Sequence, residues 1–253
     1  MKKYYISIVK NRYIRKIYKR REVSTTDELV KNLLEELNCE TAFTIPLFGG
    51  IEISESVVVT WIIMAVMTIA SICLVRNLKV SNPGKKQLIL ETGIGGIYNF
   101  IEETIGEHGK RYIPYMMTVM LYLGVANIIG LFGFKPPTKD LNVTAGLALM
   151  SIVLIEYSSI HKRGFKGWIK NFAQPVAIIA PIKVLELFIR PLSLCMRLFG
   201  NILGAFVVME LLKLVAPLFV PIAFSFYFDI FDGLIQAYVF VFLTSLFIKE
   251  GLE

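Results

Sequence analysis

The chain has 253 residues, of which 55% are apolar and only 19% are charged, and its mean hydropathy is 0.61. Soluble domains are about 45–50% apolar and about 25% charged. This composition excludes an ordinary soluble domain, a nucleic-acid-binding domain, a disordered tail protein and a secreted disulfide scaffold as the main identity. The net charge of +7 belongs to one end, because residues 1–21 hold nine Lys or Arg and no acid.

Residues 1–50 are predicted to be a basic N-terminal extension. A helix-start pattern at 25–28 precedes apolar residues with helical spacing at 29–37, which predicts one short amphipathic helix. The basic segment either contacts anionic lipid or an acidic partner, or is a solvated run of charge.

Residues 51–253 are predicted to be an all-α integral membrane domain. A membrane helix needs about 20 predominantly apolar residues. Five segments are long and apolar enough, and they cover residues 57–75, 113–133, 141–160, 181–212 and 217–248. Residues 86–111 alternate apolar and acidic positions with helical spacing, which predicts an amphipathic helix at the membrane interface. A basic, aromatic loop is expected at 161–170.

Two basic loops, 76–86 and 161–170, set the expected orientation. Cytoplasmic loops of membrane proteins are rich in Lys and Arg, so both loops and the C-terminus should face the cytoplasm. The N-terminus then lies outside, although its segment is basic. Either the basic segment is outside despite its charge, or a re-entrant segment near 42–53 changes the number of crossings.

Polar residues fall on one stripe of each of the last two membrane segments. At about 100° per residue, the polar residues of the fourth segment span an arc of about 80°. They are Glu186, Arg190, Ser193, Arg197 and Asn201. A second stripe on the last segment holds Asp229, Asp232 and Gln236. Two facing helices with polar stripes could enclose a hydrated path that lipid does not reach.

Ionisable groups inside membrane segments are costly and usually mark an ion or proton path. An arginine stays protonated and lowers the pKa of a carboxylic acid brought near it. Arg197 could therefore take the proton from a passing carboxyl group and repel leaking cations. The carboxylates expected to relay protons are Glu186, Glu210, Asp229 and Asp232. For Arg190, snorkelling to the interface is an alternative, and for Glu186 the alternative is a simple ion pair with Arg190.

No pattern predicts a cofactor, a metal or a nucleotide site. Cys39, Cys73 and Cys195 are scattered, without metal spacing or a disulfide framework. The chain has no G-x-x-x-x-G-K phosphate loop and no H-E-x-x-H motif. We expect an ion-translocating chain without an ATP site, and whether it counts as an enzyme is left open.

The segment from Arg197 to Asn201, Arg-Leu-Phe-Gly-Asn, together with residues 190–194, resembles the signature of subunit a of the rotary F-type ATP synthase. Residues 137–144 and 236–244 are also similar to segments of that family, and the resemblance covers about 50–250. It implies a membrane stator beside a ring of c subunits, with two half-channels that carry H⁺ or Na⁺ to and from the ring carboxylates. Arg197 would be the essential arginine, with Asn201 and Gln236 as polar neighbours.

The resemblance also implies the surroundings of the chain. The last two helices would form a long, tilted hairpin against the ring. Partners would be the c-ring, the b-subunit stalk, other Fo and F1 subunits and the lipid bilayer, without nucleic acid. The expected location is a bacterial plasma membrane, crossed several times, and an organellar inner membrane is the alternative.

Two positions depart from the family pattern. Phe206 stands where the family often has Glu or His, and Glu210, one turn later, is a candidate substitute. Asp229 stands where the family often has His or Glu, and Asp232 adds a second carboxylate. A different function remains possible from the residues alone, namely a stand-alone secondary ion transporter, which also places ionisable groups at mid-membrane.

Overall fold

The computed structural model describes residues 41–45, 51–76, 78–79, 83–132, 134–172, 180–215 and 224–252. Residues 1–40 form a separate unit that lies outside the described residues, so the predicted amphipathic helix of the extension does too. The second unit, Thr41–Glu253, holds every element of the described fold.

The first described elements are two short strands, β1 (Thr41–Ile45) and β2 (Ile51–Ser54), which pair antiparallel with Ile45 opposite Ile51. One alternative for the topology assigned this region to a re-entrant membrane segment. A strand pair leaves edge N–H and C=O groups unpaired, and the hydrocarbon core does not tolerate such groups where lipid reaches them. The two strands therefore do not fit a re-entrant segment that lipid surrounds.

Within the described residues, five helical stretches are long and apolar enough to cross a membrane, which confirms the predicted all-α membrane protein with about five membrane helices. They are Glu55–Val75, Glu107–Leu131, Leu141–Ile169, Ala180–Met209 and Phe224–Leu252. The first is helix α2 (Glu55–Val75), which carries a single acid in its first turn and no base before Arg76.

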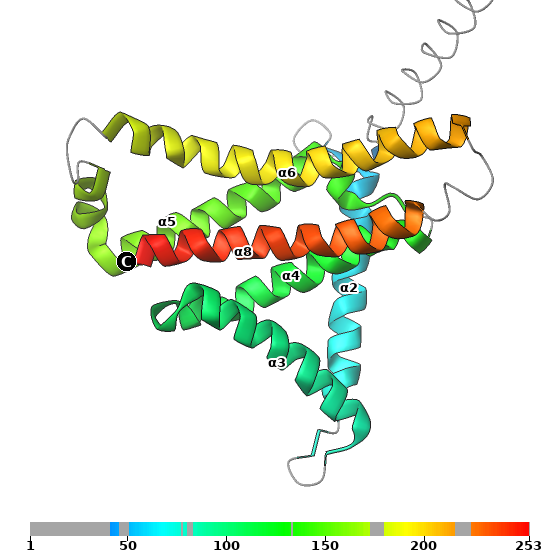
Figure 1. The fold of residues 1–253 in the computed structure, drawn as a ribbon, viewed down its shortest axis with the longest axis horizontal. Coiled ribbons are helices and arrows are strands. Elements are labelled where there is room, and N and C mark those ends of the chain that lie inside the picture. The colour runs from blue at the N-terminus through cyan, green and yellow to red at the C-terminus, as the bar shows by residue number, and fades with distance from the viewer. Residues whose placement is uncertain are drawn as a thin grey trace, which may run out of the picture. The chain divides into compact units, whose positions relative to one another are not determined.

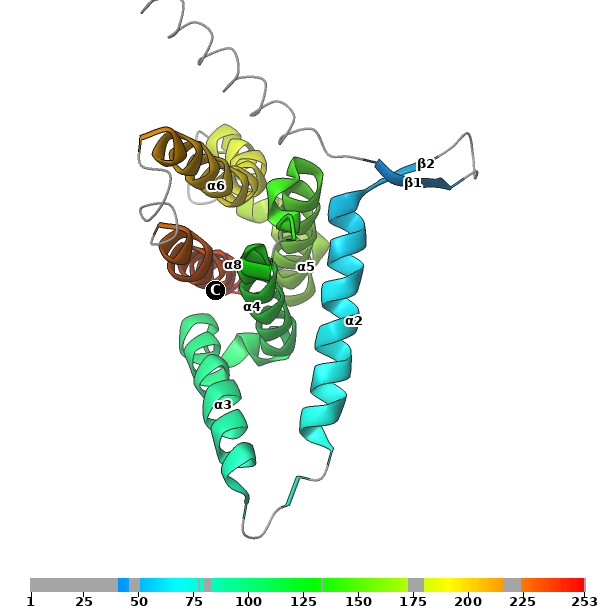
Figure 2. The ribbon, with the colours of Figure 1, turned by 90° about the vertical axis from the view of Figure 1, so that its right-hand side faces the viewer.

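Helix α3 (Lys85–Ile105) covers most of the predicted interfacial segment and ends at Gly106, whose φ of 80° is easily reached only by glycine. A 3-10 turn, η1 (Glu107–Tyr112), then leads into α4 (Ile113–Ile128). Figure 2 shows α2 and α3 extending beyond the bundle of α4, α5, α6 and α8. The location of α3 at a membrane interface stays a prediction.

Two 3-10 turns, η2 (Ile129–Phe132) and η3 (Pro137–Lys139), separate α4 from α5 (Leu141–Phe172). Asp140 is almost fully buried at the start of α5. One of its carboxylate oxygens accepts the backbone N–H of Asn142 at 2.9 Å, and the other accepts the Ser54 hydroxyl at 3.1 Å. Asp140 thus caps α5 and ties it to the end of β2.

Helix α5 is longer than the sequence predicted. The loop expected at 161–170 is wrong, because the chain stays helical to Phe172 and breaks only at Gly164, where φ is 70°. After this break the Trp168 indole N–H donates to the Glu156 carboxylate at 2.7 Å, which holds the second part of α5 close to the first. The Lys162 ammonium donates to the Leu252 carbonyl, so α5 also binds the end of the last helix.

The last two long helical stretches are α6 (Ala180–Val215) and a stretch formed by a π-helix, η5 (Tyr227–Asp232), continuing into α8 (Gly233–Leu252). Figure 1 shows α6 and α8 running alongside one another across α4 and α5. Residues 216–223, which include the predicted start of the last helix at 217, lie outside the described residues. The tilt of both helices against a ring stays a prediction.

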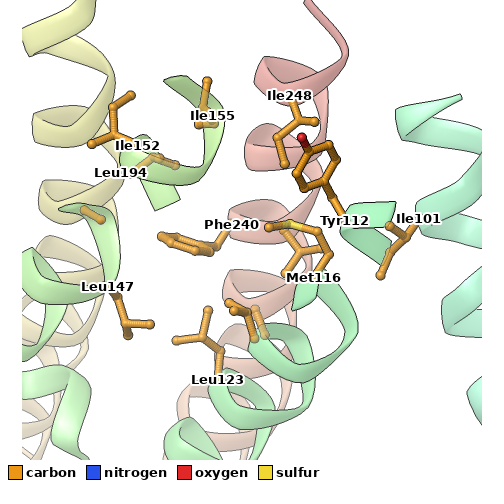
Figure 3. Packing of buried hydrophobic residues seen from close by; sticks show 14 of the residues in the cluster. Ile101, Tyr112, Met116, Leu123, Leu147, Ile152, Ile155, Leu194, Phe240 and Ile248 are labelled. Carbon is orange, nitrogen blue, oxygen red and sulfur yellow. The ribbon is translucent and has the colours of Figure 1, made fainter. Parts of the chain in front are cut away.

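The apolar core gathers side chains from α3, η1, α4, α5, α6 and α8. Figure 3 shows its centre, where Phe240 of α8 is fully buried among neighbours from α4, α5 and α6. The labelled members are Ile101, Tyr112, Met116, Leu123, Leu147, Ile152, Ile155, Leu194, Phe240 and Ile248. By contrast, Trp61, Ile69 and Ile72 of α2 are each more than half exposed, as a lipid-facing helix requires.

Candidate functional site

Asn201 of α6 joins the two polar stripes. Its side-chain N–H donates to Asp232 Oδ2 at 2.7 Å and also lies 3.5 Å from Gln236 Oε1. Gln236 is only 6% exposed. Its amide nitrogen finds no hydrogen-bond partner among the described residues. Buried amides are nearly always paired, so the Gln236 nitrogen is an exception among the described residues, as are the buried hydroxyls of Tyr115, Ser151 and Ser245.

Asp232 reaches Asn201 from the last position of the π-helix η5. The Gly233 N–H that follows bonds to the carbonyls of both Ile230 and Phe228. A π turn carries the i→i+5 bond and so holds one residue more than the corresponding α turn. The predicted angles assumed a regular α-helix through this segment, and nothing in the sequence signalled the extra residue. Asp232 and Gln236 nevertheless approach the same Asn201 amide.

Arg197 lies one turn before Asn201 on α6, and its side chain is exposed. None of the residues that the structure describes forms a hydrogen bond or an ion pair with it. Its neighbour Leu198 is fully buried in the core and fixes that turn of α6. The Arg197 guanidinium is therefore carried on a rigid helix and directed away from the packed bundle. Ser193, one turn earlier, is exposed as well.

Arg190 is in the opposite situation, with a side chain only 13% exposed. Its Nη2 pairs with Glu186 Oε1 at 2.8 Å and with Glu250 Oε2 at 2.9 Å. Its guanidinium carbon also lies 4.7 Å from the centre of the Phe247 ring. Of the alternatives open from the sequence, the structure shows the ion pair with Glu186, to which it adds a second carboxylate from α8.

The sequence prediction missed Glu250 and Phe247. Glu250 comes eighteen residues after Asp232, about five α-helical turns, so it continues the stripe of Asp232. The helical spacing from Asp232 could have identified Glu250, but the last membrane segment was predicted to end at 248, before this residue.

A cleft of about 80 Å³ opens beside this ion pair, between α5, α6 and the end of α8. Its charged lining comes from Glu156, Lys183, Glu186, Arg190 and Glu250. The cleft therefore provides a charged region at one end of the α6–α8 pair, about three helical turns from Asn201 along α6.

Two predicted path residues have side chains outside the described part of the chain. Asp229 falls within the π-helix and Glu210 within α6, but the structure describes neither side chain. The role expected for each stays a prediction. Among the residues that are described, no group of three or more His, Cys, Asp or Glu side chains could hold a metal ion.

Comparison with known proteins gives one consistent result. The sequence profile of a family described as ATP synthase A chain matches residues 57–249. The chain is 39% identical to an ATP synthase subunit a of Geotalea daltonii over 205 residues, covering 79% of this chain and 88% of that one. It is 37% identical to an ATP synthase subunit a of Moorella thermoacetica over 203 residues, covering 80% and 92%. It is 36% identical to an ATP synthase subunit a 1 of Pelobacter propionicus over 231 residues, covering 89% and 95%.

Proposed function

The chain belongs to the ATP synthase A chain family, and we propose how its residues couple ion flow to rotation. As a family member it is a multi-pass membrane subunit of the ATP synthase Fo complex. We propose that it forms two half-channels, that these pass H⁺ or Na⁺ to and from carboxylates of a c-ring, and that Arg197 controls the exchange. The remaining partners that this proposal includes are the b-subunit stalk and the other Fo and F1 subunits, in a bacterial plasma membrane.

The single observation that carries the proposal is the contrast between two arginines on one helix. Arg190 is balanced by Glu186 and Glu250, whereas Arg197 is exposed and has no partner among the described residues. A charge on a membrane helix costs about 2.5–3.5 kcal/mol on the insertion scale, so an unbalanced arginine there needs a functional reason. A carboxylate supplied by a neighbouring subunit would provide its partner.

The chemistry at Arg197 follows from its permanent charge. A protonated carboxyl group that approaches the guanidinium becomes more acidic, because the nearby positive charge stabilises its ionised form. The group then loses its proton and pairs transiently with Arg197. The same positive charge repels protons and cations, which prevents ions from crossing without moving the ring.

The released proton needs a path of acceptors. We place this path at Asn201, one turn after Arg197 on α6, and at its partners Asp232 and Gln236. Asp232 is the nearest described carboxylate to Asn201, at 2.7 Å, and the Gln236 side-chain oxygen lies 3.5 Å from the same Asn201 nitrogen. Ser193, Asp229 and Glu210 are the further members that the proposal places along this path. Glu186 and Arg190, in the charged cleft, belong to the opposite end of the same helix pair.

The driving force is electrical as well as chemical. Each elementary charge that crosses a potential of 100 mV contributes about 2.3 kcal/mol. A stator that let ions pass without ring movement would lose this energy, so blocking the leak matters as much as conducting the ion.

The proposal is tested with Arg197→Ala in the complete complex, in native membrane vesicles. We expect ATP synthesis and ATP-driven ion pumping to be lost while the amount of assembled complex is unchanged, because the ring carboxylates no longer have a partner that discharges them. Arg76→Ala, which removes an exposed arginine at the end of α2, is the matched control and should leave both activities intact. Coupled pumping that survives Arg197→Ala would refute the assigned role.

A further inference from the structure

Asn127, in the last turn of α4, connects three elements from a buried position, with only 6% of its surface exposed. Its side-chain N–H donates to the Gly233 carbonyl at 2.9 Å. Its side-chain oxygen accepts the Thr138 hydroxyl at 2.9 Å, and Thr138 in η3 is fully buried. Both ends of the amide are thus used, and its orientation is fixed.

The acceptor of this bond is the first residue of α8, directly after the π-helix η5. A Cβ atom on Gly233 would lie 2.8 Å from the Asn127 Cβ, so α4 touches the backbone of α8 at this point. The preceding residue is Asp232, which receives the hydrogen bond of Asn201. One peptide bond therefore separates the residue that Asn127 holds from the carboxylate of the proposed path.

Asp232 depends on where the start of α8 is held. It is the residue directly before Gly233, and from Asp232 to Gln236 regular α-helical geometry places both side chains on one stripe. A shift of the start of α8 relative to α4 would carry Asp232 with it, and its bond of 2.7 Å to Asn201 would be lost. The π turn just before Gly233 adds to this dependence, because π turns occur mostly as short insertions within α-helices, frequently at functional sites.

We infer that Asn127 is a positioning residue of the ion path: by holding Gly233, it fixes the start of α8 and so directs Asp232 toward Asn201. The inference rests on the proposed function and adds to it a residue that lies outside both polar stripes. Asn127 does not touch the ion. It acts through the backbone of residue 233, and Thr138 keeps its amide turned the right way.

The test is Asn127→Asp in the complete complex, with ion conduction through the membrane sector measured per assembled complex. Aspartate keeps the shape of the side chain and can still accept the Thr138 hydroxyl, and in its ionised form it has no proton for the Gly233 carbonyl. Asn127→Leu, which is of similar size and has no proton donor, is measured beside it, because a protonated aspartate still donates to that carbonyl. We expect conduction to fall about fivefold, the factor that corresponds to one lost hydrogen bond. The matched control is Tyr122→Phe, which removes another interhelical bond of α4, that to Thr60 at 3.2 Å, and should leave conduction unchanged.

A double-mutant cycle separates positioning from general loosening of the bundle. In an Asp232→Asn background, Asn127→Asp should lower conduction no further, because the carboxylate that it positions is absent. Additive losses would overturn the inference, as would full conduction in Asn127→Asp alone.

A second variant keeps the inference testable if Asn127→Asp fails to assemble. Thr138→Val releases only the oxygen of the Asn127 amide, and we expect a loss of conduction of about twofold that again disappears beside Asp232→Asn. Full conduction in Thr138→Val, or a loss that persists beside Asp232→Asn, would contradict it. Failure of the proposed function is recognised separately, since Arg197→Ala would then retain coupling whatever Asn127→Asp does.

Discussion

At Gly233 the absence of a side chain allows α4 and α8 to meet. The position has an ordinary helical φ of −59°, so glycine is needed there for space and not for backbone freedom. The Cβ of Asn127 occupies the volume that a methyl group would take. Two arginines seven residues apart on α6 differ in their surroundings. Glu250 reaches Arg190, whereas no described carboxylate reaches Arg197.

The residue-scale prediction is that Gly233→Ala destabilises the membrane sector by about 1–3 kcal/mol, the usual cost of overpacking. The added methyl group would push α4 from α8 or displace the end of the π-helix. Gly146→Ala in α5 is the matched control, since an added Cβ there meets nothing within 4 Å, and it should be neutral or slightly stabilising. Thermal unfolding of the purified complex checks both, and equal stability of the two variants would contradict a close contact at Gly233.

Between elements, polar contacts among the described side chains hold α6 to the stretch of η5 and α8 at two places. Asn201 bonds Asp232 near one end, and Arg190 pairs with Glu250 near the other. These pairs give the two helices an antiparallel arrangement. In a membrane, where lipid tails are as apolar as leucine, such interhelical hydrogen bonds and close packing replace the hydrophobic effect as the source of association.

The element-scale prediction concerns Arg190→Ala, which would leave Glu186 and Glu250 facing each other without a cation. We expect a loss of about 1–2 kcal/mol in stability. This is below the cost of breaking a fully buried pair, because the Glu186 and Glu250 side chains are 47% and 61% exposed. Glu250→Gln should cost less, and adding it to Arg190→Ala should restore part of the loss. Melting temperatures of the complex measure all three, and strictly additive shifts would contradict this ion-pair link between α6 and α8.

Across the membrane domain, some described helices are packed into the bundle, whereas others have few buried residues. Helix α2 keeps only Ser56, Val59 and Ile63 buried, whereas α8 buries residues along its full length. The Arg197 side of α6 is likewise uncovered, with Leu192 and Met196 more than half exposed beside it. One such surface suits lipid, and the surface with a charged residue suits a protein partner that carries the opposite charge.

The prediction at this scale distinguishes the proposed stator from a stand-alone transporter. The full-length chain reconstituted alone in liposomes should show no ion flux above empty liposomes, since half of each conducting route would be a ring carboxylate that is absent. Co-reconstitution with the ring subunits should restore flux. Robust flux from the chain alone would favour the transporter.

The membrane class, the presence of long apolar helices and the polar residues of α6 and α8 could all be predicted from the amino-acid sequence. These depend on local quantities, namely the apolar content of about 20 consecutive residues and the period of the helix. The same local information placed Asn201, Asp232 and Gln236 on stripes that could meet, and the structure brings them together.

Which polar residues are partners could not be predicted, because it depends on how the helices pack. The pairing of Arg190 with Glu250, the π turn before Gly233 and the hold of Asn127 on Gly233 depend on how helices distant in sequence are aligned to within a few ångströms. The continuation of α5 through 161–170 has the same cause. Its basic residues predicted a loop, but the chain is helical there with a break at Gly164, and Trp168 and Lys162 donate to Glu156 and Leu252. Local composition cannot encode such register, because it arises from the packing of several helices at once.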